Sequence, residues 1–325
     1  MSIGILAYLF HTARQDDQFD NFFTTDKQWS WIALAFCVTF SANIISFLRW
    51  RIMVRALGLS FTAFDAIRIG FIGSFFSLIA FGVLGGDTLR AFYVARQNKN
   101  RAPEAISSVV ADRVLGLLTM LSCASVAFLL LDTSSIATEH PAKMATIQFA
   151  CKIVLGLTTA GLVGVATVFF SPQIVNLRWY QKLFEIPKFG ELIKRLTEVV
   201  LVYRSKPGAV FVSLLISIGV NGCFVVAIYS MAAGLTQSHP SFSDHLLIEP
   251  ISMVANAAPL PGGLGGMELA MDFLYDAFSY QTGVIVAFAL RFSLLCVSAI
   301  GAAFWFMNRS QIADALDSAV EQIEN

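Results

Sequence analysis

Four charged side chains lie deep within long apolar stretches of this sequence. Asp87 is followed 26 residues later by Arg113, and Glu268 is followed 23 residues later by Arg291. Each arginine comes about ten residues into its apolar segment, which is roughly 15 Å along a helix and close to the middle of a ~30 Å hydrocarbon core. Charged groups at such depth are costly and are functional candidates by default. These four residues are therefore candidates for binding the polar part of a ligand.

The same four residues also allow a purely structural interpretation. Two internal salt bridges, Asp87–Arg113 and Glu268–Arg291, would hold each acidic segment against the apolar segment that follows it. The sequence does not choose between ion pair and ligand contact, and both can apply at different stages of a transport cycle.

Glycines and prolines precede both acids. The stretch LGGD covers 84–87, and APLPGGLGGMELAM covers 258–271. Prolines stop an incoming helix, and glycines permit tight turns and close approach of the backbone. We therefore expect a broken helix at each stretch. Eight residues are expected to shape a cavity there: Gly85, Gly86, Pro259, Pro261, Gly262, Gly263, Gly265 and Gly266.

The helix that leaves each break would start inside the membrane. In the second stretch it should begin near Met267, with Glu268 in its first turn, whereas Asp87 is placed like an N-cap. The free N–H groups and positive dipole end of such a helix can hold an anionic group such as a phosphate. The two acids would repel a pure anion and favour a zwitterionic or amine-bearing head group, or a proton-coupled step.

The composition indicates that membrane helices must position these residues. The chain has 325 residues, of which 56% are hydrophobic and 14% charged, with a mean hydropathy of +0.69. A soluble domain is nearer ~45–50% apolar and ~25% charged. Because about 20 apolar residues cross a bilayer as a helix, we predict an all-α, polytopic helical bundle. Its five spans are expected at 28–48, 103–131, 146–170, 207–235 and 281–307.

Lysine and arginine predict the orientation of these spans. Eight of them lie in 49–101 and seven in 171–206, so both segments are expected on the cytoplasmic side. The apolar stretches 61–86 and 244–280 must then begin and end on the same side, and each should dip into the membrane and return. The polar tail, 308–325, is expected to be cytoplasmic.

Order and spacing together predict two repeats of inverted topology. They cover about 28–131 and 207–307, and each contains one broken re-entrant helical hairpin. Both belong to a single transmembrane domain, 1–307, and an amphipathic connection at about 172–206 joins them. A glycine pair followed by an acid is a weak motif alone, and chance is the alternative explanation.

No pattern typical of catalysis or of a cofactor site occurs in the chain. It has no CxxC pair, no HExxH and no GxxxxGK[ST] loop. We expect no metal, no cofactor, no nucleic-acid partner and no enzymatic activity, although a membrane-embedded transferase stays open. Asp112 is expected to face the cytoplasm. Glu249, Asp272 and Asp276 are expected to be solvated near the outer boundary.

Several segments in order resemble one known family. They are FGVLGGDTLRAFYVARQ at 81–97, AISSVVADRVLGLLTML at 105–121 and ANAAPLPGGLGGMELA at 255–270. With an arginine-bearing last span, they resemble the lysylphosphatidylglycerol synthase transmembrane region, or flippase-like domain, over about 28–307. In the family's best-known members this module precedes a cytoplasmic aminoacyl-transferase domain and moves the modified lipid between leaflets. The chain ends at Asn325 and resembles the stand-alone form, so the resemblance implies no lipid aminoacylation.

Two features depart from the family pattern. The first apolar segment, IGILAYLF at 3–10, is shorter than the family's usual first span. The stretch FGVLGGD at 81–87 lacks a proline that the family often has, so we expect the first hairpin to bend more gently than the second.

Three functions follow as hypotheses. The favoured one is a protein of the plasma (inner) membrane, with a cytoplasmic C-terminus, that binds a polar-headed phospho- or glycolipid and moves it between leaflets. A small-solute or ion-coupled secondary transporter is the first alternative. The second is a non-transporting membrane partner of a separate lipid- or glycan-modifying enzyme, which 172–206 could dock if it does not simply lie on anionic lipid.

Overall fold

The computed structural model describes residues 26–79, 83–98, 101–130, 141–187, 190–256 and 265–307, and all regular elements in them are helical. The long helices are α3 (Trp29–Ala56), α6 (Ala102–Leu130), α8 (Pro141–Phe170), α11 (Pro207–Leu235) and α14 (Gly283–Met307). Two shorter pairs are α4 (Ala63–Ile79) with α5 (Val83–Gln97), and α12 (Phe242–Asn256) with α13 (Gly266–Ala277). The connection from α8 to α11 contains η1 (Pro172–Asn176), α9 (Arg178–Gln181), η2 (Lys182–Glu185) and α10 (Gly190–Tyr203).

The five long helices confirm the prediction of a multi-pass bundle. Among the described residues, these five are long and apolar enough to cross a membrane. They also present large apolar side chains outward, including Leu130, Phe170 and Phe211. Because such side chains are shielded from water by lipid in a membrane protein, this outward apolar surface fits helices that face lipid.

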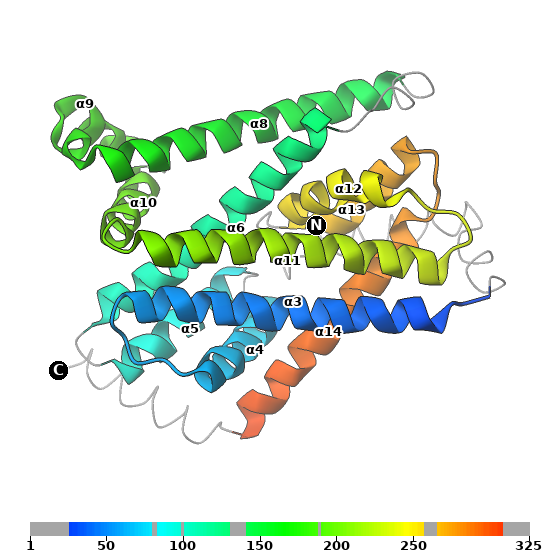
Figure 1. The fold of residues 1–325 in the computed structure, drawn as a ribbon, viewed down its shortest axis with the longest axis horizontal. Helices are drawn as coiled ribbons and strands as arrows, with labels where there is room; N and C mark the ends of the chain where they lie inside the picture. Colours follow the sequence, from blue (N-terminus) through cyan, green and yellow to red (C-terminus); the bar gives the residue numbers. More distant parts are fainter. Residues whose placement is uncertain are drawn as a thin grey trace.

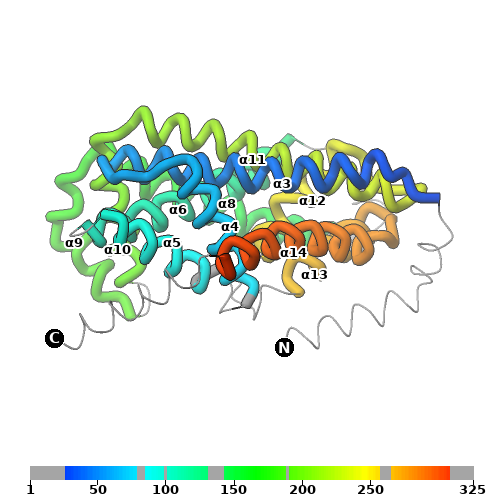
Figure 2. The backbone as a smooth tube through the Cα atoms, turned by 90° about the horizontal axis from the view of Figure 1, so that it is seen from below, coloured from blue at the N-terminus to red at the C-terminus, as the bar shows by residue number. Residues whose placement is uncertain are grey.

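Helices α3 and α11 lie side by side and antiparallel along most of their length (Figure 1, Figure 2). At one end, the Gln28 N–H donates to the Gly234 carbonyl at 3.0 Å. We call this end of the bundle the Gln28 end. At the other, the Arg101 guanidinium donates to the Leu57 carbonyl at 2.8 Å, and we call it the Arg101 end.

The two basic segments meet at the Arg101 end. The Tyr203 hydroxyl, at the end of α10, donates to the Met53 carbonyl in the last turns of α3 at 3.0 Å. Arg204 donates to the Phe169 carbonyl at 2.7 Å, which ties the end of α8 to the same region. The connections expected to share the cytoplasmic side therefore lie at one end of the bundle. Helix α3 itself runs to Ala56, beyond the predicted end of the span at residue 48, because WRIMVRA continues the helix.

Each short helix pair begins and ends at the same end of the bundle. Before α4 and after α5, the Ser60 N–H donates to the Asn98 side chain at 2.8 Å. The start of α12 and the end of α13 meet where His245 Nε2 and the Tyr275 hydroxyl lie 2.8 Å apart. The α4–α5 pair starts from the Arg101 end and the α12–α13 pair from the Gln28 end, so the pairs point toward each other (Figure 1).

The glycines of the first expected break lie inside a helix. Gly85 and Gly86 are in the first turns of α5 rather than in a turn between helices, and Asp87 is inside that helix rather than at its N-cap. A Cβ built on Gly86 would lie 2.2 Å from the Gly73 carbonyl oxygen. The glycine is therefore needed for close packing of α5 on α4, and the expectation that it makes the turn is wrong.

The second expected break falls mostly outside the described residues. Pro259, Pro261, Gly262 and Gly263 belong to that segment. Gly265, by contrast, precedes α13 with φ of +103°, a conformation that favours glycine. Gly266 is the first residue of α13, one residue before the expected start.

Helix α14 crosses the bundle and joins the two pairs. It packs on α13 in its first half and on α4 in its second (Figure 2). The contact with α4 is tight, because a Cβ built on Gly301 would lie 2.0 Å from the Phe71 carbonyl oxygen. Aromatic side chains surround this crossing, with Phe71 stacked against Phe304 at 6.2 Å between ring centroids.

We predict that Gly301→Ala destabilises the protein although alanine is the better helix former. The added methyl group meets fixed backbone, and overpacking of this kind costs about 1–3 kcal/mol. Gly156→Ala on α8 is the control, because a Cβ there meets nothing within 4 Å and should stabilise the helix by up to ~1 kcal/mol. Thermal unfolding in detergent measures both. Equal melting temperatures for the two variants would contradict the close crossing of α14 and α4.

Candidate functional site

A cavity of about 1050 Å³ lies between α5, α6, α8, α9 and α10, near the Arg101 end. We call it the Arg113 cavity. Its polar lining groups are Asp87, Thr88, Arg113, Tyr180, Arg195 and Thr197. Aliphatic and aromatic side chains and two glycines form the rest of the lining, including Phe92, Leu117 and Leu118. The cavity thus combines several polar groups with a predominantly apolar lining.

Arg113 and Asp87 form an ion pair in the lining of this cavity. Arg113 Nε donates to Asp87 Oδ2 at 2.6 Å, and Arg113 Nη2 donates to Asp87 Oδ1. The side chain of Arg113 is 41% exposed although it sits eleven residues into α6, whereas that of Asp87 is 15% exposed. Since Arg113 lines the cavity, its guanidinium can reach a bound molecule.

A second arginine shares the same carboxylate. Arg90 Nη1 lies 3.7 Å from Asp87 Oδ1, and Arg90 Nη2 donates to the Gly70 carbonyl at 3.2 Å. Its guanidinium also lies over the rings of Phe47 and Trp50, which stabilises the buried cation. Two arginines and one carboxylate leave this group with one net positive charge.

Glu268 and Arg291 form a closed pair at the start of α13. Arg291 Nε donates to Glu268 Oε1 at 2.7 Å, and Arg291 Nη2 donates to Asn256 Oδ1 at 3.0 Å. Glu268 Oε2 accepts the Gly265 N–H at 3.0 Å, so the carboxylate also fixes the first turn of α13. Their side chains are 0% and 12% exposed, and neither residue lines the Arg113 cavity.

The structure therefore brings the four candidate charges together as two pairs rather than as one group. The first pair lines a large cavity, and the second is enclosed by protein. Each acid on a short helix is held by an arginine from the long helix that follows it in the chain. The ion pairs inferred from the spacing are present in both halves.

A third buried pair contradicts the expectation that Asp112 faces the cytoplasm. Arg49 Nε donates to Asp112 Oδ1 at 3.0 Å, and Arg49 Nη1 donates to the Ser217 hydroxyl at 2.6 Å. Arg49 and Asp112 are 6% and 4% exposed. Successive residues of a helix point about 100° apart, so Asp112 faces α3 and α11 while its neighbour Arg113 faces the cavity. The sequence signal that could have indicated a buried Asp112 is its position next to Arg113 within an apolar span, because both charges then need partners inside the bundle.

The expectation that Glu249 is solvated near the outer boundary is also wrong. This residue lies in α12 and is only 1% exposed. Asp276 fits the expectation better, because its side chain is 49% exposed and pairs with Lys143 at 2.7 Å. Burial of Glu249 follows from the close packing of α12 against α6, α11 and α13.

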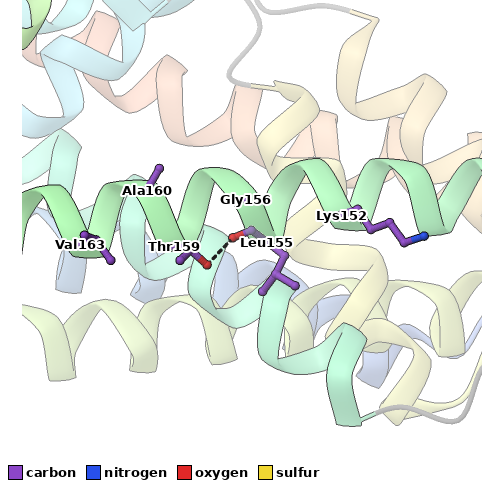
Figure 3. A pocket seen from close by; sticks show the side chains of 6 residues that line it. All are labelled: Lys152, Leu155, Gly156, Thr159, Ala160 and Val163. Atoms are coloured by element: carbon purple, nitrogen blue, oxygen red, sulfur yellow. Dashed lines mark hydrogen bonds between the residues drawn. The ribbon is translucent and has the colours of Figure 1, made fainter. Parts of the chain in front are cut away.

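A second pocket, along α8, is not a candidate ligand-binding site. Figure 3 shows its six lining residues, which all belong to that one helix: Lys152, Leu155, Gly156, Thr159, Ala160 and Val163. The Thr159 hydroxyl donates to the carbonyl of Leu155 in its own helix at 2.8 Å. With walls from a single helix, this hollow is a surface groove.

The five apolar helices and the buried ion pairs belong to a chain that matches one known membrane-domain family. The sequence model of the lysylphosphatidylglycerol synthase TM region matches residues 1–310. The chain belongs to this family. No match to the chain was found among curated proteins or among solved structures. In this family member, the Arg113 cavity has a charged pair, Asp87 and Arg113, in its lining.

We predict that the Arg49–Asp112 pair contributes far more to stability than an exposed pair of the same type. Asp112→Ala leaves a buried guanidinium without its counter-charge, which typically costs about 3–5 kcal/mol. Glu191→Ala breaks the exposed Arg195–Glu191 pair, which should cost no more than ~1 kcal/mol. Thermal unfolding in detergent compares them. A melting temperature for Asp112→Ala as high as that of Glu191→Ala would show that α3, α6 and α11 do not depend on this pair.

Proposed function

We propose that the protein binds a polar-headed membrane lipid in the Arg113 cavity and moves it between leaflets. The single observation that carries this proposal is the cavity itself. It places the partly exposed guanidinium of Arg113 within a mostly apolar lining from α6, α8 and α10, which also contains Arg195 and Thr197. The head group would contact Arg113 and Asp87, and an acyl chain would lie along the apolar part of this lining.

The size and lining of the cavity support a lipid over a small solute. Ligand pockets commonly measure ~300–1,000 Å³, and the Arg113 cavity lies at the upper limit at about 1050 Å³. A small polar solute would leave most of the aliphatic lining without a partner. An amphipathic ligand fills both regions, because its apolar part covers Leu117 and Leu118 while its polar part stays near Arg113.

The charge balance favours a head group that carries a phosphate. Asp87 alone would repel an anion, as the sequence suggests, but Arg90 and Arg113 outweigh it by one charge. Arginine donates paired, charge-assisted hydrogen bonds that match phosphate oxygens. In the proposed cycle, Arg113 exchanges one Asp87 oxygen for a phosphate oxygen when the lipid binds.

The two short pairs are proposed to be re-entrant hairpins of two inverted repeats. The supporting contacts are those that bring each pair back to its own end of the bundle, at Ser60 and Asn98 and at His245 and Tyr275. The basic Arg101 end is then cytoplasmic, and the Met307 end of α14 lies on that side. In this conformation the cytoplasmic-side pair is open to a cavity and the other is closed, which is the asymmetry that alternating access requires.

We predict that Arg113→Gln slows lipid movement without preventing folding. Arg90 still neutralises Asp87 in this variant, whereas the phosphate contact is lost. Charge-assisted hydrogen bonds are worth about 1.5–3 kcal/mol, so the rate should fall roughly ten- to hundredfold. Movement of a fluorescent phosphatidylglycerol between leaflets of proteoliposomes measures it, alongside mass spectrometry of co-purified lipid.

Arg178→Gln is the matched control for this experiment. It removes the same charge from an exposed position on α9 that does not line the cavity. Equal rates for the wild type and Arg113→Gln would overturn the site. Solute uptake by sealed vesicles, without lipid movement, would favour the small-solute transporter instead.

We also predict that the closed pair is needed for movement but not for the fold. The double variant Glu268→Gln, Arg291→Gln removes both charges together, so no unpaired ion is left behind. It should melt within a few degrees of the wild type, because the large cost of breaking a buried pair comes from the charge left without a partner, and none is left here. Lipid movement should nevertheless be lost, while binding of lipid in the Arg113 cavity is retained. Unchanged movement would make the Glu268–Arg291 pair purely structural.

A further inference from the structure

Glu249 is a buried carboxylate that no other part of the proposed cycle uses. It lies seven residues into α12, it is 1% exposed, and neither of its oxygens has a hydrogen-bond partner among the described residues. The hydroxyl of Ser252, one helical turn further on, is likewise buried without a partner there. Buried polar groups are nearly always satisfied, so this pair of residues needs a physical explanation.

No basic side chain in the described structure forms an ion pair with Glu249. From α6, the titratable group within electrostatic range is the thiol of Cys123. Of the acids on α13, Glu268 and Asp276 are paired with arginine and lysine, and Asp272 also takes part in an interaction of its own. From α11, Tyr229 packs its ring against His245 rather than presenting a charge.

The other titratable groups of α12 do not supply a counter-charge either. His245 lies one turn before Glu249, but its Nδ1 is 2.8 Å from the Ser241 carbonyl and its Nε2 is 2.8 Å from the Tyr275 hydroxyl. Asp244 accepts a hydrogen bond from the hydroxyl of Ser241 at 2.7 Å. An ionised Glu249 would therefore be an isolated anion in an apolar site, which is far more costly than the neutral acid.

The helix that carries Glu249 has a weak point next to it. Pro250 has no backbone N–H, so the carbonyl of Leu246 lacks its helical donor. Helices bend preferentially at such positions. A bend there would turn Glu249 relative to α6 and α13 while the first turn of α12 stays attached through His245.

We propose that Glu249 is a proton-binding site that controls the position of α12. In the conformation described, the carboxyl group holds a proton. When α12 moves away from α6, α11 and α13, the group meets water and releases the proton to it as hydronium. Proton binding thus stabilises the packed position of α12. Used together with the proposed function, this site would couple lipid movement to a proton gradient, but the site itself does not depend on lipid transport.

The first test is the pH dependence of thermal stability in detergent. The packed protein holds a proton that the unfolded chain releases, so the melting temperature of the wild type should fall as the pH rises from about 5 to about 9, the range in which buried carboxyls titrate. Glu249→Gln mimics the neutral acid and should abolish that fall. Asp276→Asn is the control, because it removes an acid that is already exposed and paired, and it should keep the wild-type slope. Parallel slopes for the wild type and Glu249→Gln would overturn the proposal.

The second test detects the proton directly. Infrared spectra of the wild type at low pH should contain the C=O stretching band of a protonated carboxyl group that is absent in Glu249→Gln. The band should disappear as the pH rises, in step with the fall in melting temperature. If no such band exists, Glu249 is ionised in the packed state and the proposal fails. If both tests succeed while phosphatidylglycerol does not move in proteoliposomes, the proton site stands and the proposed lipid function falls.

Discussion

The cost of placing a charge inside an apolar bundle is the constraint on which this structure depends. Ions inside an apolar bundle pair with one another or with backbone carbonyls, and the three pairs inside this bundle each join two helices. Arg49 on α3 meets Asp112 on α6 and Ser217 on α11, and so joins three of the long helices at one point. The hydrogen bonds of Arg49, together with the packing of apolar side chains, therefore fix the relative positions of those helices.

The same constraint explains why the two halves of the bundle differ in openness. Glu268 uses both oxygens, since it binds Arg291 and caps the first turn of α13, and Asn256 also accepts a hydrogen bond from the arginine. Asp87 pairs with two arginines, and the side chain of one of them, Arg113, is partly exposed. One carboxylate fixes a helix start, and the other leaves cationic donors facing a cavity.

The long apolar segments were predictable from the sequence, and the Asp87–Arg113 and Glu268–Arg291 pairs were one of the two interpretations that it left open. Runs such as 207–235 have no competing interpretation, and an acid followed by the next intramembrane arginine has few other partners available. The side of a helix that a residue faces was harder to predict. Asp112 and Arg113 are neighbours with opposite environments, and apolar residues on all sides of α6 leave no amphipathic pattern to distinguish them.

Positions governed by packing between separate helices were beyond reach of the sequence alone. Gly86 resembles a turn residue in the string LGGD, but it lies in α5 because the Gly73 carbonyl of α4 comes so close. Glu249 resembled an edge residue because α12 is short and follows a polar connection. Its burial depends on three neighbouring helices that only the three-dimensional arrangement brings together.

The antiparallel contact of α3 and α11 has a mechanical consequence. A Cβ on Gly234 would come within 3.0 Å of the Ile32 backbone nitrogen, and at the opposite half Ser217 is tied to Arg49. Because α3 and α11 are in close contact in both halves, they cannot move relative to each other without breaking the hydrogen bond between Arg49 and Ser217. These two helices therefore form a rigid pair. In the proposed transport cycle, we therefore expect the short helices, α8 and α10 to move relative to α3 and α11.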